Sequence, residues 1–316
     1  MLAILKTTAT GLERLEEFEP GSWIDLVGPT AEELEQVSRE LGIPLDLLKG
    51  PLDEQEKSRI DVEDGLTHVI VDIPVLIRED DQQGYETIPL GILLHPDYIV
   101  TTCLRPNPIL GEFEHSVIRG FATFWKTRFL LQILQRVAAF YLRYLYRIDR
   151  ETEKLERELR VSMKNKEIFD LLGLQKALVY FTTSLRSNEG VLQKMSRTKT
   201  IKMYEEDEEL LEDVLVENKQ ASEMAKIYTD ILTGMMGAFT SVISNNLNRV
   251  MKLLTSITIC LSIPTIVASL WGMNVPVPWE NYAPGFVITL VIAFGISTTL
   301  AVVFWALFDP EQKKRI

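Results

Sequence analysis

Cysteine and histidine are scarce in this sequence, which holds two cysteines and three histidines in 316 residues. Cys103 precedes a long helical region and Cys260 lies inside an apolar run, so we do not expect them to form a disulfide. That cysteine usage is typical of a reducing, cytosolic compartment for the part of the chain outside the apolar run. His68, His95 and His115 show no ligand spacing, which argues against a zinc site built from them.

Three further absences narrow the class of function. No Gly-rich phosphate loop, nucleophile elbow or metal-ligand His pair is present, so we expect neither an enzyme nor an organic cofactor. The formal net charge of −12 argues against a nucleic-acid partner and is compatible with a surface that meets cations. The first residues lack a basic region and a long apolar region, so the N-terminal part is expected to stay in the cytosol.

Charged residues are missing from two long stretches, from Leu253 to Trp279 and from Phe286 to Phe308. Each stretch exceeds the ~20 apolar residues that cross a hydrocarbon core of ~30 Å. Buried helices of a soluble domain are the alternative, but such helices are shorter and usually keep a polar face. The sequence therefore predicts two membrane spans with lipid as a partner.

The flanking charges predict the topology of these spans. Arg249 and Lys252 precede the first span, and residues 313–315 form a basic tail after the second. The loop between the spans contains Glu280 and no Lys or Arg. By the positive-inside rule, both termini are cytosolic and the loop lies outside a cytoplasmic membrane that the chain crosses twice.

The first third of the chain reads as a mixed domain of strands and short helices. Strand-like runs at 2–7 and 23–27 are separated by a polar segment, and the capping-box pattern Thr30-x-x-Glu33 opens a helix. Runs rich in Val, Ile and Thr between Arg59 and Cys103 predict a mostly antiparallel meander whose one face is covered by helices. The acidic segment 79–81, followed by Gly84, marks a hairpin turn within it.

Three long helices are expected to follow, over about 125–163, 166–195 and 204–273, and the third has no proline before Pro264. The first turns of the third helix are strongly acidic. Their acidic residues are Glu205, Glu206, Asp207, Glu208, Glu209, Glu212, Asp213 and Glu217. This run is either a solvated helix start that the macrodipole favours or a site for divalent cations.

A stripe of small polar residues follows the third helix at alternating steps of three and four. Its members are Ser241, Ser244, Asn248, Met251, Thr255, Thr258, Ser262, Thr265 and Ser269, all polar except the methionine. Such spacing keeps one face of a helix turned inward in a bundle. In a membrane, the stripe either holds helices together or lines a watery path. Because two spans cannot surround a pore, a path would require a homo-oligomer.

The first span ends in Gly272-Met273-Asn274, and this tripeptide carries a family resemblance. With the preceding IPTIVASLW it resembles the end of the pore helix of CorA-type magnesium transporters. The stretch 248–255, NRVMKLLT, resembles the place where that helix enters the membrane, and segments 29–43 and 53–60 are also similar to the family. The resemblance extends over essentially the whole chain.

The resemblance implies an α+β membrane protein that assembles as a homopentamer. A cytosolic α/β (αβα) domain would feed a funnel of long helices, and two C-terminal transmembrane helices would follow. The implied divisions are 1–120 for the α/β domain, 121–249 for the funnel, 250–273 for the pore-lining span, 274–285 for the outer loop, 286–308 for the second span and 309–316 for the cytosolic tail.

The resemblance also implies residue roles. Gly272, Met273 and Asn274 would form the outer mouth, where Asn274 carbonyls bind hydrated Mg²⁺ through its waters. The family's gates and polar rings correspond to Asn248, Met251, Leu254 and Thr265, so the family places Leu254 on the pore wall where the stripe has its neighbour Thr255, and helical pitch cannot separate the two. The candidate pore lining is therefore Ser244, Asn248, Met251, Leu254, Thr255, Thr258, Ser262, Thr265 and Ser269. Two departures stand out: the acidic loop of many members is replaced by VPVPWEN, and Gly237 stands where some members have an aspartate ring.

Regulation, by the same resemblance, would come from Mg²⁺ bound between neighbouring cytosolic domains. Asp213 falls where the family has a sensing aspartate, and Asp80 or Asp81 of the acidic hairpin is the candidate partner. The expected function is therefore transport of Mg²⁺, with Co²⁺ or Ni²⁺ as further cargo. The alternatives are a Zn²⁺ transporter of the same architecture and a membrane-anchored sensor or interaction protein.

Overall fold

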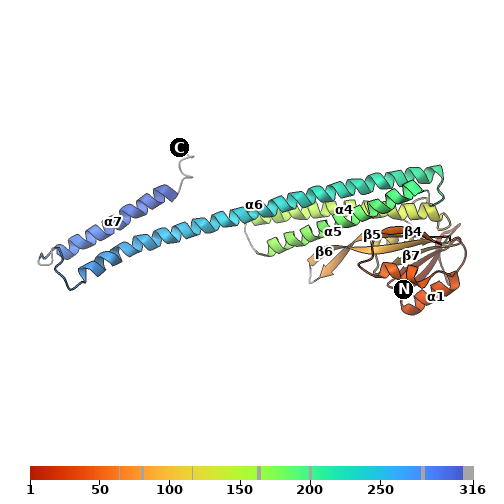
Figure 1. Cartoon of the computed structure of the whole chain (residues 1–316), viewed down its shortest axis with the longest axis horizontal. Coiled ribbons are helices and arrows are strands. Elements are labelled where there is room, and N and C mark those ends of the chain that lie inside the picture. The colour runs from red at the N-terminus through yellow and green to blue at the C-terminus, as the bar shows by residue number, and fades with distance from the viewer. Residues whose placement is uncertain are drawn as a thin grey trace. The chain divides into compact units, whose positions relative to one another are not determined.

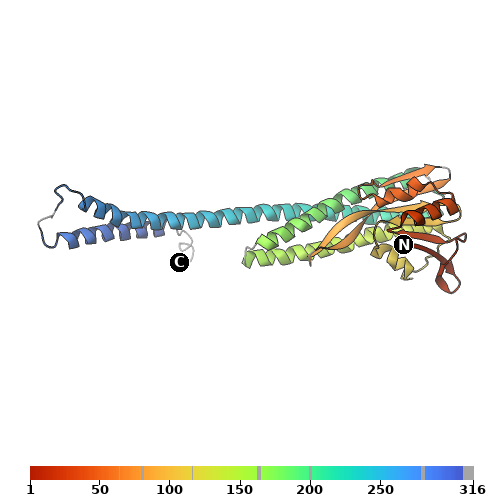
Figure 2. The same cartoon turned by 90° about the horizontal axis from the view of Figure 1, so that it is seen from below.

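The computed structural model describes residues 1–63, 65–79, 82–115, 117–161, 165–198, 201–278 and 282–308. The chain divides into two compact units, Met1–Thr233 and Gly234–Ile316, called here the N-terminal and the C-terminal unit. Figures 1 and 2 show the elements of each unit from two directions. One helix, α6 (Glu205–Trp271), begins in the first unit and ends in the second.

A seven-stranded sheet forms the centre of the N-terminal unit, in the order β2-β1-β3-β7-β6-β5-β4. The strands are β1 (Leu2–Thr8), β2 (Gly11–Leu15), β3 (Trp23–Val27), β4 (Arg59–Glu63), β5 (Leu66–Glu79), β6 (Gln82–Leu94) and β7 (Ile99–Cys103). Neighbouring strands are antiparallel except for β3 and β7, which pair in parallel from Trp23↔Ile99 to Val27↔Cys103. The predicted, mostly antiparallel sheet is confirmed, whereas β2 lies in the segment that the sequence left as a polar connection.

Helices cover both faces of this sheet and make three layers (Figure 1). The helices are α1 (Ala31–Leu41), α2 (Leu45–Lys49), the 3₁₀ turn η1 (Gly50–Leu52), α3 (Pro108–Glu114), α4 (Lys126–Val161), α5 (Asn165–Thr198), α6 and, in the C-terminal unit, α7 (Gly285–Phe308). Ile24 and Leu26 pack against α1 and α2 on one face. Successive side chains of a strand alternate between faces, so Trp23 points to the other face, where its ring meets Phe129 of α4 at 5.1 Å.

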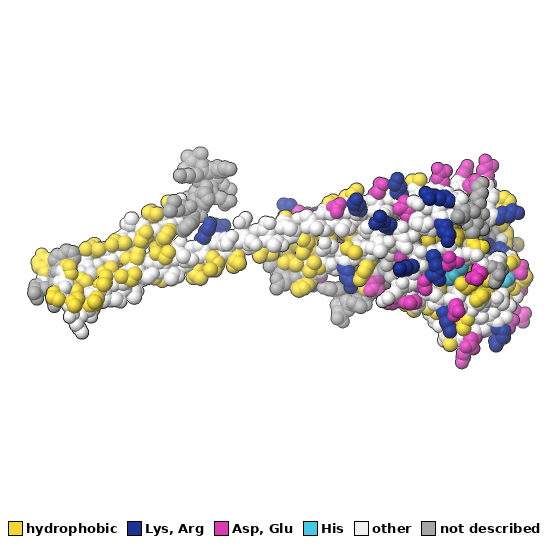
Figure 3. All heavy atoms as spheres, in the orientation of Figure 1, with side chains coloured by type: hydrophobic (Ala, Val, Ile, Leu, Met, Phe, Trp, Pro, Cys, Tyr) yellow, Lys and Arg dark blue, Asp and Glu magenta, His cyan; other side chains and the backbone are white. Residues whose placement is uncertain are grey.

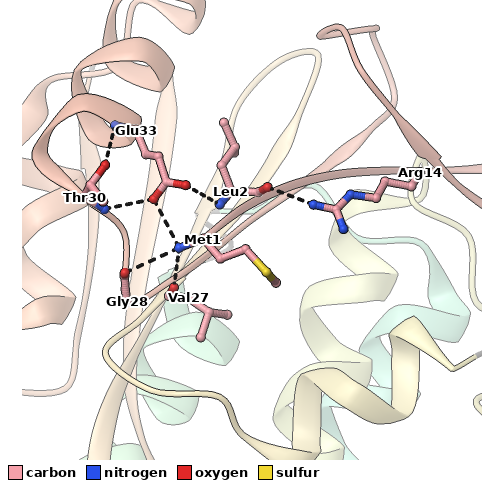
Figure 4. A network of polar contacts seen from close by, with 7 residues as sticks. All are labelled: Met1, Leu2, Arg14, Val27, Gly28, Thr30 and Glu33. Carbon is pink, nitrogen blue, oxygen red and sulfur yellow. Dashed lines mark hydrogen bonds and ion pairs between the residues drawn. The ribbon is translucent and has the colours of Figure 1, made fainter.

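The long helices agree with the sequence-based prediction to within a few residues at most ends. The N-terminal cap of α1 is also as predicted, because the Thr30 side chain accepts from the Glu33 backbone and Glu33 accepts from the Thr30 backbone. Figure 4 shows that Glu33 reaches further, to the backbone nitrogen of Leu2 at 2.9 Å and to the Met1 nitrogen at 3.1 Å. One carboxylate therefore joins the start of α1 to the start of β1. These donors lower the pKa of Glu33, and the Thr30 backbone N–H is the largest cause.

A chain of polar side chains is buried between β3, β7 and α3. Trp23 Nε1 donates to Thr101 Oγ1 at 2.7 Å, and Thr101 Oγ1 donates to Asp25 Oδ1 at 2.6 Å. Asp25 is only 1% exposed, and its Oδ2 has no donor among the described residues. Burial is the largest cause that raises the Asp25 pKa, and the neighbouring Glu114 carboxyl raises it further. The two carboxyl groups can share a hydrogen bond only when one of them holds a proton.

We expect Asp25→Asn to stabilise the chain at pH 8 by on the order of 1–3 kcal/mol, because an amide can donate to Glu114 and carries no buried charge. The wild-type native state holds a proton that the unfolded chain releases above pH ~4, so wild-type stability falls as pH rises from there. The gain should therefore shrink toward pH 5. Melting of the full chain in detergent at both pH values tests this, with the exposed Asp46→Asn as control. An equal effect at both pH values would contradict the shared proton.

Candidate ion pathway

The C-terminal unit consists mainly of two apolar helices. The later part of α6 and the helix α7 are long and apolar enough to cross a membrane, and their apolar side chains are almost entirely exposed in the single chain. Figure 3 shows hydrophobic side chains over the surface of this unit, whereas Lys, Arg, Asp and Glu are concentrated on the N-terminal unit. A soluble protein would bury such helices, so this exposure agrees with the predicted spans.

Within this unit, α7 packs against one side of α6. From Ser256 on, the partly buried residues of α6 are Ser256, Cys260, Ile263, Pro264, Val267 and Trp271, and all but Pro264 recur at steps of three and four. The facing residues of α7 are small at Gly285, Ala293 and Ser297. Small residues let two helices approach closely, which is the usual packing of helices in lipid.

The predicted polar stripe lies on the other side of α6. Its members from Ser241 to Ser269 are all exposed, as are Leu254 and Thr255. At ~100° per residue, Thr258 and Thr265 project from roughly the side opposite to Cys260 and Val267. The stripe therefore takes no part in holding α6 to α7 within one chain. If it holds helices together, it does so between copies of the chain.

Three hydroxyl groups of the stripe within the apolar run donate to the backbone of their own helix. Thr258 Oγ1 donates to the Leu254 carbonyl at 2.8 Å, Ser262 Oγ to the Thr258 carbonyl at 2.6 Å and Thr265 Oγ1 to the Leu261 carbonyl at 3.2 Å. Each hydroxyl has one proton and two lone pairs. Because the proton is used inside the helix, the oxygen presents an acceptor outward, and the stripe becomes a row of neutral acceptors.

A proline in α6 creates a second polar feature, on the side that faces α7. Pro264 has no N–H and therefore cannot donate to the carbonyl four residues earlier, which is that of Cys260. Ser297 Oγ of α7 donates to this carbonyl at 2.6 Å. The contact was not predicted from the sequence, although a proline within a span indicates that some group must satisfy the freed carbonyl.

We expect Ser297→Ala to destabilise the folded chain by ~1 kcal/mol, because the Cys260 carbonyl loses its donor. Thr299→Val is the matched control, since the Thr299 hydroxyl donates to Gly295 of its own helix at 2.8 Å. In a Pro264→Ala background the backbone N–H returns, and Ser297→Ala should then cost much less. Melting of the wild type, the two single variants and the double variant in detergent gives this double-mutant cycle, and additive effects would rule out the coupling.

The tripeptide follows the end of α6. The helix ends at Trp271, and the Gly272 nitrogen still donates to the Ala268 carbonyl at 2.9 Å. A Cβ on Gly272 would lie 3.4 Å from the Ala268 oxygen, which is an ordinary van der Waals contact, so a single chain would accommodate a side chain there. Met273 and Asn274 are exposed, and the Asn274 amide lies at the same end of α6 as the polar stripe.

The acidic start of α6 divides into residues with and without structural roles. Asp207 is buried and accepts from the Tyr204 backbone at 3.1 Å, and Glu206 pairs with Arg128 at 2.6 Å. Asp213 is exposed and lies one turn before Glu217. Burial and, second, repulsion by Asp213 raise the Glu217 pKa, which indicates two carboxylates in close electrostatic contact.

Asp213 is the one predicted regulatory residue that lies among the described residues. Asp80 and Asp81 lie outside the described residues, so their relation to Asp213 stays a prediction. Among the residues that the structure describes, no group of three or more Asp, Glu, His or Cys side chains could hold a metal ion. A site between copies of the chain is not visible in one chain.

Comparison with known proteins adds independent findings. The family model described as "CorA-like Mg2+ transporter protein" matches residues 19–313. The cobalt/magnesium transport protein CorA of Methanocaldococcus jannaschii is 30% identical over 294 residues, which cover 89% of each chain.

Solved structures agree with this match. The complete structure of the CorA magnesium transporter from Methanocaldococcus jannaschii has a TM-score of 0.82 at 27% identity and covers 98% of both chains. The full-length CmaX protein, at 17% identity and a TM-score of 0.72 over 97% of both chains, shares the fold. The match of the family model over nearly the whole chain and the 30% identical relative lead to one conclusion: the chain belongs to the family of CorA-like Mg²⁺ transporter proteins.

Proposed function

We propose that this chain transports divalent cations across a membrane, with Mg²⁺ as the principal cargo and Co²⁺ or Ni²⁺ as further cargo. The observation that carries the proposal is the row of outward-facing neutral acceptors on α6, on the side away from α7. A single copy cannot enclose a path with this one face. Five copies, each turning its stripe toward a common axis, would form a pore with α7 outside it.

The chemistry of hydrated Mg²⁺ fits such a lining. The ion keeps its waters tightly, so the surface that it meets consists of water hydrogens, which need acceptors. Oxygens of Thr258, Ser262 and Thr265 supply these acceptors without a fixed charge that would trap the ion. A ring of Asn274 amide oxygens at the end of α6 would hold the hydrated ion at the mouth, beside Gly272 and Met273.

Further exposed positions of α6, on the stripe or beside it, differ in polarity, which indicates separate roles along the pore. Met251 and Leu254 are apolar and exposed, 53% and 56% respectively. Apolar rings in a pore can close it by excluding water. We assign closure to these two residues, and hydrated-ion contact to Ser244, Asn248, Thr255 and Ser269.

The N-terminal unit would then lie in the cytosol and sense Mg²⁺. In this arrangement 1–120 is the α/β domain, 121–249 the funnel, 250–273 and 286–308 the spans, 274–285 the outer loop and 309–316 the cytosolic tail. The exposed Asp213 and the neighbouring Glu217 repel each other, and a bound cation would relieve this repulsion. Mg²⁺ bound there, with Asp80 or Asp81 of a neighbouring copy, would stabilise a closed assembly.

We expect Asn274→Ala to reduce Mg²⁺ uptake into proteoliposomes roughly tenfold, which is equivalent to ~1.4 kcal/mol of lost ion binding at the mouth. Asn245→Ala is the matched control, because Asn245 is an exposed asparagine of α6 outside the stripe. Parallel uptake of Zn²⁺ by the wild type tests the zinc alternative. Absence of any ion flux through the wild type would favour a membrane-anchored sensor instead.

We expect Asp213→Ala to weaken closure, so that Mg²⁺ flux persists at internal Mg²⁺ concentrations several-fold above those that close the wild type. The reason is that the carboxylate that would bind Mg²⁺ at the sensing site is gone, so more Mg²⁺ is needed to stabilise the closed assembly. Flux from vesicles loaded with graded Mg²⁺ measures the shift, and Glu212→Ala, an exposed carboxylate one residue away, is the control. An unaltered concentration dependence in the Asp213 variant would remove this residue from the sensing site.

A further inference from the structure

A cavity of about 400 Å³ lies in the N-terminal unit, between β5, the segment before α3 and α4. One part of its wall is apolar and comes from Val75, Leu76, Pro106 and Pro108. Its size is within the range of sites for small organic ligands, which run from ~300 to ~1,000 Å³. Neither the stripe on α6 nor the tripeptide contributes to it, so transport does not account for this cavity.

Another part of the wall comes from α4 and contains two arginines, Arg143 and Arg147. Arg136, Arg143 and Arg147 are separated by seven and four residues and so share one face of the helix, and the last two line the cavity. Glu112 of α3 is the one carboxylate in the lining that balances them. It pairs with Arg136 and lies 3.6 Å from Arg143. Arg147 makes no ion pair with any residue that the structure describes. Glu112 is thus shared by Arg136 and Arg143, and Arg147 has no carboxylate partner among the described residues, on a chain whose net charge is −12.

Two buried aromatic rings hold the arginines in place. The Arg143 guanidinium lies 4.2 Å from the centre of the Phe140 ring, and that of Arg147 lies 5.7 Å from the centre of the Tyr144 ring. Both rings are at most 3% exposed, and they meet edge to face at 5.9 Å. A guanidinium that rests on a fixed ring loses less freedom when its N–H groups bind an anion. The guanidinium groups of Arg143 and Arg147 are therefore preorganised at the cavity.

We propose that this cavity binds a small organic phosphate, with Arg143 and Arg147 on the phosphate group and the apolar wall against the rest of the molecule. Arginine forks match phosphate oxygens in a bidentate arrangement. An inorganic ion would leave most of the 400 Å³ cavity and its apolar wall unused. The proposal does not depend on transport, because no residue of the pore or of the metal-sensing site takes part in it.

Binding to the purified full chain in detergent, measured by calorimetry, tests the site. The probes are adenosine 5′-monophosphate, glycerol 3-phosphate and adenosine. We expect both phosphates to bind and adenosine to bind at least tenfold more weakly than its monophosphate. A preference for the nucleotide over glycerol 3-phosphate would assign the ligand to the nucleotides, and the reverse to lipid-headgroup phosphates. Absence of binding by both phosphates overturns the proposal.

The variant Arg143→Gln/Arg147→Gln should reduce phosphate binding at least tenfold. Arg150→Gln is the matched control, because Arg150 is an exposed arginine of the same helix outside the cavity. Unchanged binding in the double variant overturns the assignment. If the double variant does not fold, phenylglyoxal labelling of the wild type replaces it. Adenosine 5′-monophosphate should then protect Arg143 and Arg147 but not Arg150, and equal labelling with and without the nucleotide overturns the proposal.

Discussion

The architecture of the C-terminal unit depends on one constraint, which is that polar groups removed from water need partners within the protein. Pro264 breaks the backbone ladder of α6 and leaves the Cys260 carbonyl without its usual donor. Ser297 of α7 supplies that donor at 2.6 Å. The bond requires the rotation of α6 that places Cys260 against Ser297. The same rotation leaves the polar stripe on the side away from α7.

The same constraint shapes the stripe itself. A serine or threonine in a span can bond to its own helix, and Thr258, Ser262 and Thr265 do so. This satisfies the donor of each hydroxyl and leaves its acceptor capacity facing outward. A surface made in this way attracts water and hydrated cations while carrying no formal charge. It differs from a ring of carboxylates, which would bind a divalent ion more tightly and release it more slowly.

The sequence predicted features whose signal is periodic or compositional. The two uncharged runs, the capping box at Thr30 and the three-and-four spacing of the stripe each carry such a signal. Features that depend on the meeting of distant segments were not predictable. β2 is a polar edge strand without a buried face to reveal it, and the rotation that selects Ser297 among the hydroxyls of α7 depends on packing. Arg147 begins a segment of mixed charge typical of a solvated helix, and only the fold shows that it faces an apolar wall.

The distribution of titratable groups separates conduction from control. Neither uncharged run contains Asp, Glu, Lys, Arg or His, so no carboxylate, amine or imidazole within the runs can change its charge with pH. Carboxylates that could respond to pH or to a bound metal are present in the N-terminal unit, where Asp25 lies close to Glu114 and Asp213 repels Glu217. α6 is the one helix that belongs to both units. A signal from the N-terminal unit therefore has a direct covalent route to the stripe, and in the proposed function it needs no charged group in the pore.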